Sequence, residues 1–290
     1  MKKRAILFIV IASILWGTSG IFVHYLAPYG FSSLELTFAR HSVAAVLMAF
    51  FLFFYNKKLF RAPLKGILIL VACGLGLVGT GSFYYASMQA ASISTAVVLM
   101  YTAPVIVMAV SVAFLGEKLT KSKFVSVILM VAGCALVSGV IGGLSFQFWG
   151  ILFGLCSGLS YSAYNIVTKM AMEKGYHPYT ATFYTFLVAG FVAFCLSDPG
   201  NILACTLKEP AVTLPLLFFL GVFTSILPYF LYTLALKDIP AGTATSLSVV
   251  EPMSATLFSV ALFGEKLSVF SLTGIIFILL ALLLLSKSES

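Results

Sequence analysis

The sequence predicts an all-α integral membrane protein with ten transmembrane helices, arranged as two inverted-topology repeats of five helices. Composition, the distribution of basic residues and an internal repeat each point to it. Of the 290 residues, 61% are hydrophobic and only 9% are charged. A soluble domain has about 45–50% apolar and about 25% charged residues. The chain therefore has too few polar groups to cover a globular surface, and the bilayer is its expected solvent.

Ten apolar segments account for most of the chain, and each is close to the roughly 20 residues that a transmembrane helix needs. Their apolar residues are continuous rather than alternating, which indicates helices and not the strands of a membrane barrel. The connections are too short for a separate soluble domain. The predicted helices are 5–27, 33–55, 66–88, 93–115, 122–140, 148–170, 178–197, 213–236, 241–263 and 268–286.

The basic residues gather on one side of these helices. With the N-terminus inside, the cytoplasmic segments hold Lys2, Lys3, Arg4, Lys57, Lys58, Arg61, Lys65, Lys118, Lys121, Lys123, Lys169, Lys174, Lys237 and Lys287. The outer side holds only Lys208 and Lys266, and Arg40 falls within a span. Cytoplasmic loops of membrane proteins carry an excess of Lys and Arg. Both termini are therefore expected in the cytoplasm, and the net charge of +8 needs no nucleic-acid partner.

The second half of the chain repeats the first. When 84–119 is shifted by 148 onto 232–267, twelve of 36 positions are identical. The matches include Pro104 with Pro252 and the Gly-Glu-Lys-Leu at 116–119 with that at 264–267. Since five helices are an odd number, the second half must enter the membrane from the opposite side. We expect two repeats, 1–143 and 144–290, of the kind from which many secondary transporters build alternating access.

Glu251 is the sharpest candidate for a functional residue, because it is the eleventh residue of a 23-residue apolar run. A carboxylate near the bilayer midplane costs about 2.5–3.5 kcal/mol and should face a cavity or a partner. Ser248 and Ser254 share its helix face, and Pro252 removes a backbone N–H. One interpretation is a site for a proton, a cation or a substrate amine. The other is a structural hydrogen bond from protonated Glu251 to the loosened helix.

Arg40 is the second charge within a span. Arginine stays protonated and needs an anion, a carbonyl or water. It could bind a substrate carboxylate. It could also be structural, extending to the outer surface or pairing with Glu35.

Aromatic and amide side chains form two stripes on helices that are partners in the repeat. Trp16 lies on the first helix, and Tyr161, Tyr164 and Asn165 share a face of the sixth. These faces are expected to meet. Rings with polar tips suit a pocket that is partly apolar and partly wet, although aromatic residues also gather at lipid interfaces. The set is completed by Tyr84, Tyr101 and Tyr232.

These features together resemble the EamA branch of the drug/metabolite transporter superfamily. The resemblance is carried by two five-helix halves, Trp16-Gly17 in the first helix, Arg40 in the second, and Pro104 and Pro252 ahead of the two Gly-Glu-Lys-Leu motifs. It implies a central cavity lined mainly by helices 1, 3, 4, 6, 8 and 9, and transport without ATP. Members are similar to exporters of amino acids and related metabolites, and some relatives carry sugars, nucleotide sugars or amines.

We therefore favour a secondary transporter of small metabolites in the cell membrane, foremost an exporter of amino acids or amines. The expected substrate site holds Glu251, Arg40 and the aromatic set, with Glu251 also coupling a proton. We expect no cofactor, metal site or catalytic residue. The expected partners are a small-molecule substrate and the lipid bilayer, with a homodimer left open. The alternatives are a transporter of sugars or nucleotide sugars, a passive channel, or a membrane enzyme using Glu251, His24 or His41 as acid–base groups.

Overall fold

The computed structural model describes residues 2–61, 66–103, 106, 110, 120–137, 147–235, 248 and 250–289. Every regular element within them is a helix. Six helical stretches are long and apolar enough to cross a membrane: Lys3–Tyr29, Ser33–Tyr55, Ile67–Ala90, Phe148–Thr168, Pro178–Leu196 and Pro210–Tyr232. Shorter apolar helices cover Phe124–Gly133, Val250–Phe263 and Val269–Ala281. The prediction of an all-helical membrane protein is confirmed at this level.

In the described residues, the first half of the chain contains six α-helices and two 3₁₀ turns. They are α1 (Lys2–Gly17), α2 (Ser19–Leu26), the 3₁₀ turn η1 (Ala27–Tyr29), α3 (Ser33–Tyr55), the 3₁₀ turn η2 (Lys57–Phe60), α4 (Ile67–Ala90), α5 (Ile93–Met100) and α7 (Lys121–Val137). The second half has α8 (Phe148–Glu173), α9 (Pro178–Leu196), α10 (Pro199–Lys208), α11 (Pro210–Gly221), the π-helical turn η4 (Val222–Ile226), α12 (Leu227–Ala235), α14 (Val250–Phe263) and α15 (Val269–Glu289).

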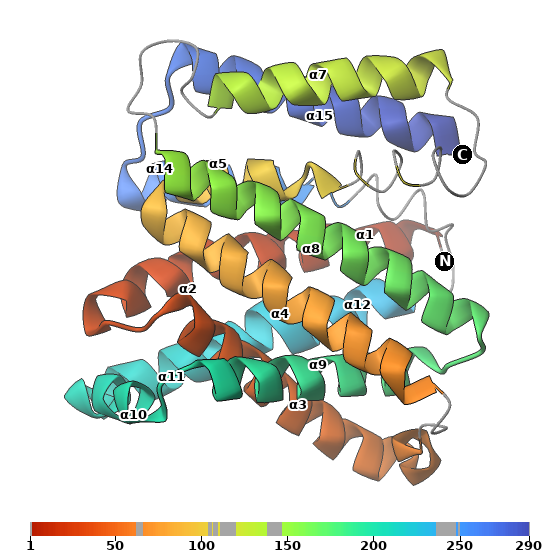
Figure 1. The fold of residues 1–290 in the computed structure, drawn as a ribbon, viewed down its shortest axis with the longest axis vertical. Coiled ribbons are helices and arrows are strands. Elements are labelled where there is room, and N and C mark those ends of the chain that lie inside the picture. The colour runs from red at the N-terminus through yellow and green to blue at the C-terminus, as the bar shows by residue number, and fades with distance from the viewer. Residues whose placement is uncertain are drawn as a thin grey trace.

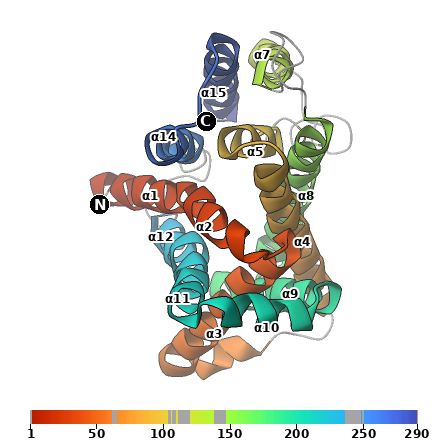
Figure 2. The same cartoon turned by 90° about the vertical axis from the view of Figure 1, so that its left-hand side faces the viewer.

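The helices form a bundle that runs across the long axis of the molecule (Figure 1). Helices α7 and α15 lie side by side at one end, and α3 packs against α9 at the other. Between them α4 packs on α8, and α1 packs on α12 and α14 (Figure 2). Both termini lie on one side of the bundle, to the right in Figure 1, and α10 lies on the opposite side.

Helix α3 begins and ends at the predicted residues, because its first turn carries a strong start signal. Ser32 accepts a hydrogen bond from the Glu35 backbone N–H at 3.3 Å, and Glu35 Oε2 accepts one from the Ser32 N–H at 2.7 Å. This reciprocal capping satisfies two N–H groups that have no partner within the helix.

Two spans that were predicted as continuous helices are interrupted. The first breaks at Thr18, within the run Gly17-Thr18-Ser19-Gly20, where glycine and hydroxyl residues favour a kink. The span predicted at 213–236 contains the π-helical turn Val222–Ile226, where the Leu227 N–H reaches back five residues to the Val222 carbonyl. Such turns occur frequently at functional sites.

Helix α10 was not predicted, since its segment is only partly apolar. It is amphipathic and begins with Asp198 as N-cap and Pro199 in its first position. It is held on the connection between α2 and α3. Asn201 donates to both carboxylate oxygens of Glu35 at 2.8 and 2.9 Å, and Lys208 Nζ donates to the Tyr29 carbonyl at 2.7 Å.

The Gly-Glu-Lys-Leu motif at 264–267 ends a helix. Gly264 follows α14 with a φ of 65°, the left-handed conformation that glycine supplies at helix C-termini. The next residue, Glu265, accepts a hydrogen bond from Ser259 and so folds back onto α14. The earlier copy of the motif, at 116–119, lies outside the described residues.

Candidate functional site

Glu251 lies in the first turn of α14 and is 8% exposed. Its Oε2 accepts a hydrogen bond from the Tyr101 hydroxyl at 2.8 Å. The same hydroxyl lies 3.1 Å from the Ser248 carbonyl. In a regular helix that carbonyl would accept from residue 252, but Pro252 has no N–H. The Glu251 N–H also donates to the Ser248 carbonyl, at 2.9 Å, so this carbonyl has a second donor in the backbone, and the freeing of a carbonyl by Pro252 stays a prediction. Ser254 instead donates to the Glu251 carbonyl at 2.9 Å.

The Tyr101 hydroxyl has one proton and two acceptors within reach. When Glu251 is ionised, Tyr101 donates to the carboxylate. When Glu251 carries a proton, the carboxyl group can donate to the Tyr101 oxygen, and Tyr101 then donates to the Ser248 carbonyl. Both protonation states of Glu251 are thus satisfied without moving the backbone.

Arg40, on α3, is 8% exposed and makes three hydrogen bonds, two of which link the two halves of the chain. Its Nε donates to Ser225 Oγ at 2.8 Å and one terminal nitrogen donates to the Thr224 carbonyl at 2.6 Å. The other terminal nitrogen donates to the Tyr85 hydroxyl at 3.2 Å. Pairing with Glu35, one predicted alternative, is not what the structure shows, since Glu35 holds the backbone of Ser32 and the amide of Asn201.

The Thr224 carbonyl is available to Arg40 because of Pro228, four residues later. A helical carbonyl accepts from the N–H four residues on, and proline has none. The proline ring also clashes with that carbonyl in a regular helix, which accounts for the π-helical turn at Val222–Ile226. The sequence signal for this partner is the buried Thr224-Ser225 pair followed by Pro228.

Glu251 and Arg40 belong to one electrostatic site, since each acts on the other's charge. Tyr84 on α4 lies in the same field and interacts with both. Its hydroxyl is buried and has no hydrogen-bond partner among the described residues. A buried hydroxyl without a partner is costly, at about 1–3 kcal/mol, and is the kind of group that a ligand can satisfy.

The aromatic residues cluster around Tyr229, which the sequence analysis did not single out. The Trp16 ring centroid lies 5.3 Å from that of Tyr229 in an edge-to-face arrangement and 5.7 Å from that of Tyr232. Phe186 packs edge-on to Tyr229 at 5.4 Å. The signal for Tyr229 is its position directly after Pro228 and three residues before Tyr232, on the same helix face.

The aromatic residues of the first and sixth helices are connected through α12 in the described residues. Tyr161 and Tyr164, on α8, stack on one another with centroids 6.2 Å apart. They reach α1 through α12, since Tyr229 interacts with Tyr164 and with Trp16. Asn165 uses its amide within α8, donating to the Tyr161 carbonyl at 2.9 Å.

The site therefore assembles one guanidinium, one carboxyl group, hydroxyls and aromatic faces from several helices. Its residues include Trp16 (α1), Arg40 (α3), Tyr84 and Tyr85 (α4), Tyr101 (after α5), Tyr161 and Tyr164 (α8), Tyr229 and Tyr232 (α12) and Glu251 (α14). The described residues contain no group of three His, Cys, Asp or Glu that could hold a metal ion. Such a set suits reversible binding of a small polar molecule.

A bundle of apolar helices around a closed polar centre defines a class, the membrane transport proteins. The particular family is shown by sequence: the profile of the EamA-like transporter family matches residues 3–139 and again 148–287, so the chain belongs to that family. It is a multi-pass membrane transporter, not an enzyme.

Relatives and a solved structure agree with this. The chain is 27% identical to the uncharacterized transporter YwfM of Bacillus subtilis, over 97% of this chain and 93% of that protein. It is 29% identical to an uncharacterized transporter of Archaeoglobus fulgidus over 92% and 90%, and 24% identical to the inner membrane transporter YicL of Salmonella typhimurium over 98% and 95%. A crystal structure shares the fold over the full length of both chains, with a TM-score of 0.66 at 16% identity.

Proposed function

We propose that this transporter exports small metabolites, amino acids or amines foremost, by alternating access of two inverted five-helix repeats, 1–143 and 144–290. The observation that carries the proposal is that Glu251 of the second half and Arg40 of the first half are both buried, each with a hydrogen bond to a tyrosine of the first half, Tyr101 and Tyr85 respectively. The two matches of the family profile, one in each half, support the division of the chain.

The packing supports a two-fold relation between the halves. Helices α3 and α9 are the second helices of their repeats and pack on one another, and so do the fifth helices, α7 and α15. The contact of α4 with α8 has its counterpart in the contact of α12 with α1. These are the pairings that a two-fold axis between the repeats requires.

Two glycine contacts support the same relation in finer detail. A Cβ on Gly74 would overlap the Val188 side chain, and a Cβ on Gly221 would overlap that of Val43. Val43 and Val188 are aligned by the offset of 145 that relates the early helices of the two halves, and Gly74 and Gly221 differ by 147. Each pair brings two helices into close contact at a position with no side chain between them.

Glu251 is the proposed site for both the proton and a substrate ammonium group. Its carboxyl group is hydrogen-bonded to Tyr101 and lies in the field of several further tyrosines, including Tyr84 and Tyr161. An ammonium group that replaces the proton would pair with the carboxylate. A cation over an aromatic face gains about 0.5–2 kcal/mol in addition. Proton and substrate would then compete for one group, which is the simplest basis of exchange.

The test is counterflow in proteoliposomes followed by competition. Saturable uptake against an internal pool separates a carrier from a passive channel. A transported amino acid is then challenged with its N-acetyl derivative, which lacks the ammonium group. We expect the N-acetyl compound to compete at least about tenfold more weakly, since a lost charged hydrogen bond costs about 1.5–3 kcal/mol. Equal competition by both compounds contradicts the pairing of the substrate with Glu251.

A further inference from the structure

A polar cavity, lined by none of the residues of the Glu251 site, lies where α8 is connected to α9. It has a volume of about 450 Å³ and opens on the side of the bundle that also holds both termini. Its lining comes from both halves: η2 and the start of α4 in the first, and the connection between α8 and α9 in the second. The lining residues are Lys58, Leu59, Arg61, Gly66, Lys174, Gly175, Tyr176, His177 and Thr180.

The cavity is strongly basic. Lys58, Arg61 and Lys174 line it, and the two connecting segments, 56–66 and 173–177, contain five Lys or Arg residues against the single acidic residue Glu173. In the part of the chain that the structure describes, no carboxylate is paired with any of these three lining cations. A cavity lined by several cations attracts anions.

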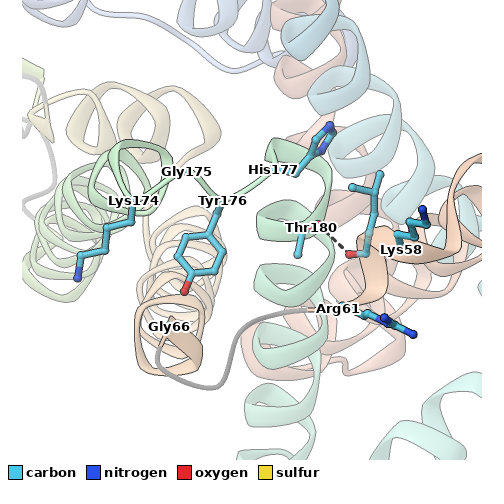
Figure 3. A pocket seen from close by; sticks show the side chains of 9 residues that line it. Lys58, Arg61, Gly66, Lys174, Gly175, Tyr176, His177 and Thr180 are labelled. Carbon is cyan, nitrogen blue, oxygen red and sulfur yellow. Dashed lines mark hydrogen bonds between the residues drawn. The ribbon is translucent and has the colours of Figure 1, made fainter.

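The cations lie on two sides of the cavity, and their charged ends do not converge on one point. Figure 3 shows Lys58 and Arg61 on one side of Thr180, and Lys174 on the other side, beyond Tyr176. The Tyr176 hydroxyl lies against Gly66, at the start of α4. The Tyr176 hydroxyl and the spaced cations fit a phosphodiester that is approached from several directions, better than they fit a small ion held by a tight cluster.

The surface beside the cavity is apolar and exposed. Leu68, two residues after Gly66, is 77% exposed, and Phe54, just before η2, is 71% exposed. These residues belong to the ends of α3 and α4, which are long enough to span a bilayer. The cavity therefore lies at the level of the lipid headgroups, with an acyl-facing surface directly below it.

We infer that this cavity binds the phosphate of an anionic phospholipid from the cytoplasmic leaflet. Basic pockets between transmembrane helices on the cytoplasmic side bind such headgroups. The exposed apolar residues favour a lipid over free phosphate, because only a lipid brings acyl chains to cover them. The assignment to the cytoplasmic leaflet rests on the proposed orientation of the termini.

A bound headgroup would connect the two halves at their cytoplasmic ends. The segment that carries Lys58 and Arg61 is already held on α9, since Thr180 donates to the Leu59 carbonyl at 2.8 Å and Tyr184 donates to the Phe60 carbonyl at 2.7 Å. A phosphate shared by η2 and Lys174 adds α8 to this contact. The lipid would thus stabilise the conformation in which these helix ends are close together.

The experiment measures lipid selectivity of the full-length protein in nanodiscs of mixed phosphatidylcholine and phosphatidylglycerol. Native mass spectrometry reports which lipids remain bound after release. The test variant is K58Q/R61Q/K174Q. The matched control, K3Q/K57Q/K121Q, removes the same charge from the same side. Lys57 belongs to the same η2 turn as Lys58, but its ammonium group lies 4.0 Å from the Phe53 ring centroid and does not line the cavity.

We expect the wild type and the control to retain phosphatidylglycerol over phosphatidylcholine by about fivefold or more, which corresponds to about 1 kcal/mol for a single basic residue near an anionic surface. The test variant should lose this enrichment. Equal loss in both variants overturns the proposal, since it would reflect diffuse surface charge. Retained enrichment in the test variant overturns it as well. If the triple variant does not fold, K58Q is compared with K57Q. Loss of phosphatidylglycerol enrichment in K58Q but not in K57Q supports the proposal, and equal loss in both or retention in K58Q overturns it.

A second measurement distinguishes the source of the phosphate. Thermal unfolding in detergent is followed with short-chain phosphatidylglycerol, with short-chain phosphatidylcholine and with millimolar inorganic phosphate. Stabilisation by phosphatidylglycerol alone, lost in the test variant, supports the lipid site. Equal stabilisation by inorganic phosphate overturns the assignment to a lipid.

Discussion

The hydrogen bond between Arg40 and the Thr224 carbonyl gives a quantitative prediction about Pro228. Thr224 is fully buried, and its carbonyl lacks the usual α-helical donor four residues on, because residue 228 is proline. Arg40 supplies a side-chain donor to this carbonyl, and replacing Arg40 by Met removes that donor. Replacing Pro228 by Ala restores a backbone N–H in the helical position. We therefore expect P228A to stabilise the protein more in the R40M background than in the wild type.

The magnitude follows from the single carbonyl involved. An unsatisfied buried acceptor costs about 1–3 kcal/mol, whereas measured side-chain hydrogen bonds within a membrane protein average about 0.6 kcal/mol and reach about 1.7. Because the carbonyl is fully buried, we expect a coupling free energy of about 1–2 kcal/mol. The stability of R40M itself is not decisive, since deleting a buried charge also removes its desolvation cost. The double-mutant cycle isolates the coupling free energy between the substitutions at Arg40 and Pro228.

The assay is reversible unfolding in mixed micelles of a mild detergent and dodecyl sulfate, applied to the wild type, R40M, P228A and the double variant. Pro215, inside α11 on the same span, is the matched control, because P215A also restores a helical N–H but at a carbonyl that Arg40 does not contact. A coupling near zero for P228A, or one equal to that of P215A, refutes the account of the π-helical turn.

Three further predictions concern the cycle and the packing. Glu251→Gln should abolish the response of transport to a pH gradient, while Tyr101→Phe should weaken it, and pH-gradient-driven flux measures both; an unchanged response in E251Q would leave Glu251 a structural role only. Gly30→Cys should form a disulfide with Cys205, because a Cβ at position 30 would lie 3.6 Å from its sulfur. G30A is the matched control, since both variants carry the strain of a side chain at the left-handed φ of 92°. Oxidation should stop transport by G30C and reductant should restore it, whereas G30A should respond to neither. Gly221→Leu should destabilise the protein by about 1–3 kcal/mol through overpacking against α3, and unaltered unfolding would contradict the close contact of these helices.

The positions of the helices could be predicted from composition and periodicity, because apolar length is a local property. The start of α3 is an example, since Ser32 and Glu35 form the cap with their own backbone. Helix α10 escaped prediction, because its start signal, Asp198-Pro199, stands in a segment that is too polar for a span. Its position depends on the bond between Asn201 and Glu35, 166 residues apart, and no local pattern predicts such a contact.

The charged members of the candidate site can be singled out from the sequence, whereas their partners cannot. Glu251 and Arg40 stand out in any hydropathy analysis, because charge in an apolar run is rare. Their partners do not: Tyr85 and Tyr229 are two of the 13 tyrosines, and only the packing of α4 and α12 brings them to the site. The break at Thr18 had a readable signal in the surrounding glycines. The prediction of one continuous helix followed the apolar run on either side of Thr18, which is otherwise uninterrupted.

The charges of the site rank the candidate substrates. All three hydrogen bonds of Arg40 end on neutral groups, and Glu251 is the carboxylate within the described residues that acts on it. With Glu251 ionised, the site is neutral as a pair. A zwitterion keeps it neutral, with its ammonium group at Glu251 and its carboxylate toward Arg40. A simple amine adds an uncompensated positive charge, and a dicarboxylate adds negative charge beside Glu251.

Uncompensated charge is costly in a site with little water, so zwitterionic amino acids should bind more tightly than amines of the same size. We expect the amide of a transported amino acid, which keeps the ammonium group and loses the carboxylate, to compete less well than the parent compound. In R40Q the fixed cation is gone, and the parent should lose this advantage over its amide. If parent and amide compete equally in the wild type, Arg40 serves only to join α3 to the π-helical turn, and amines replace amino acids as the expected substrates.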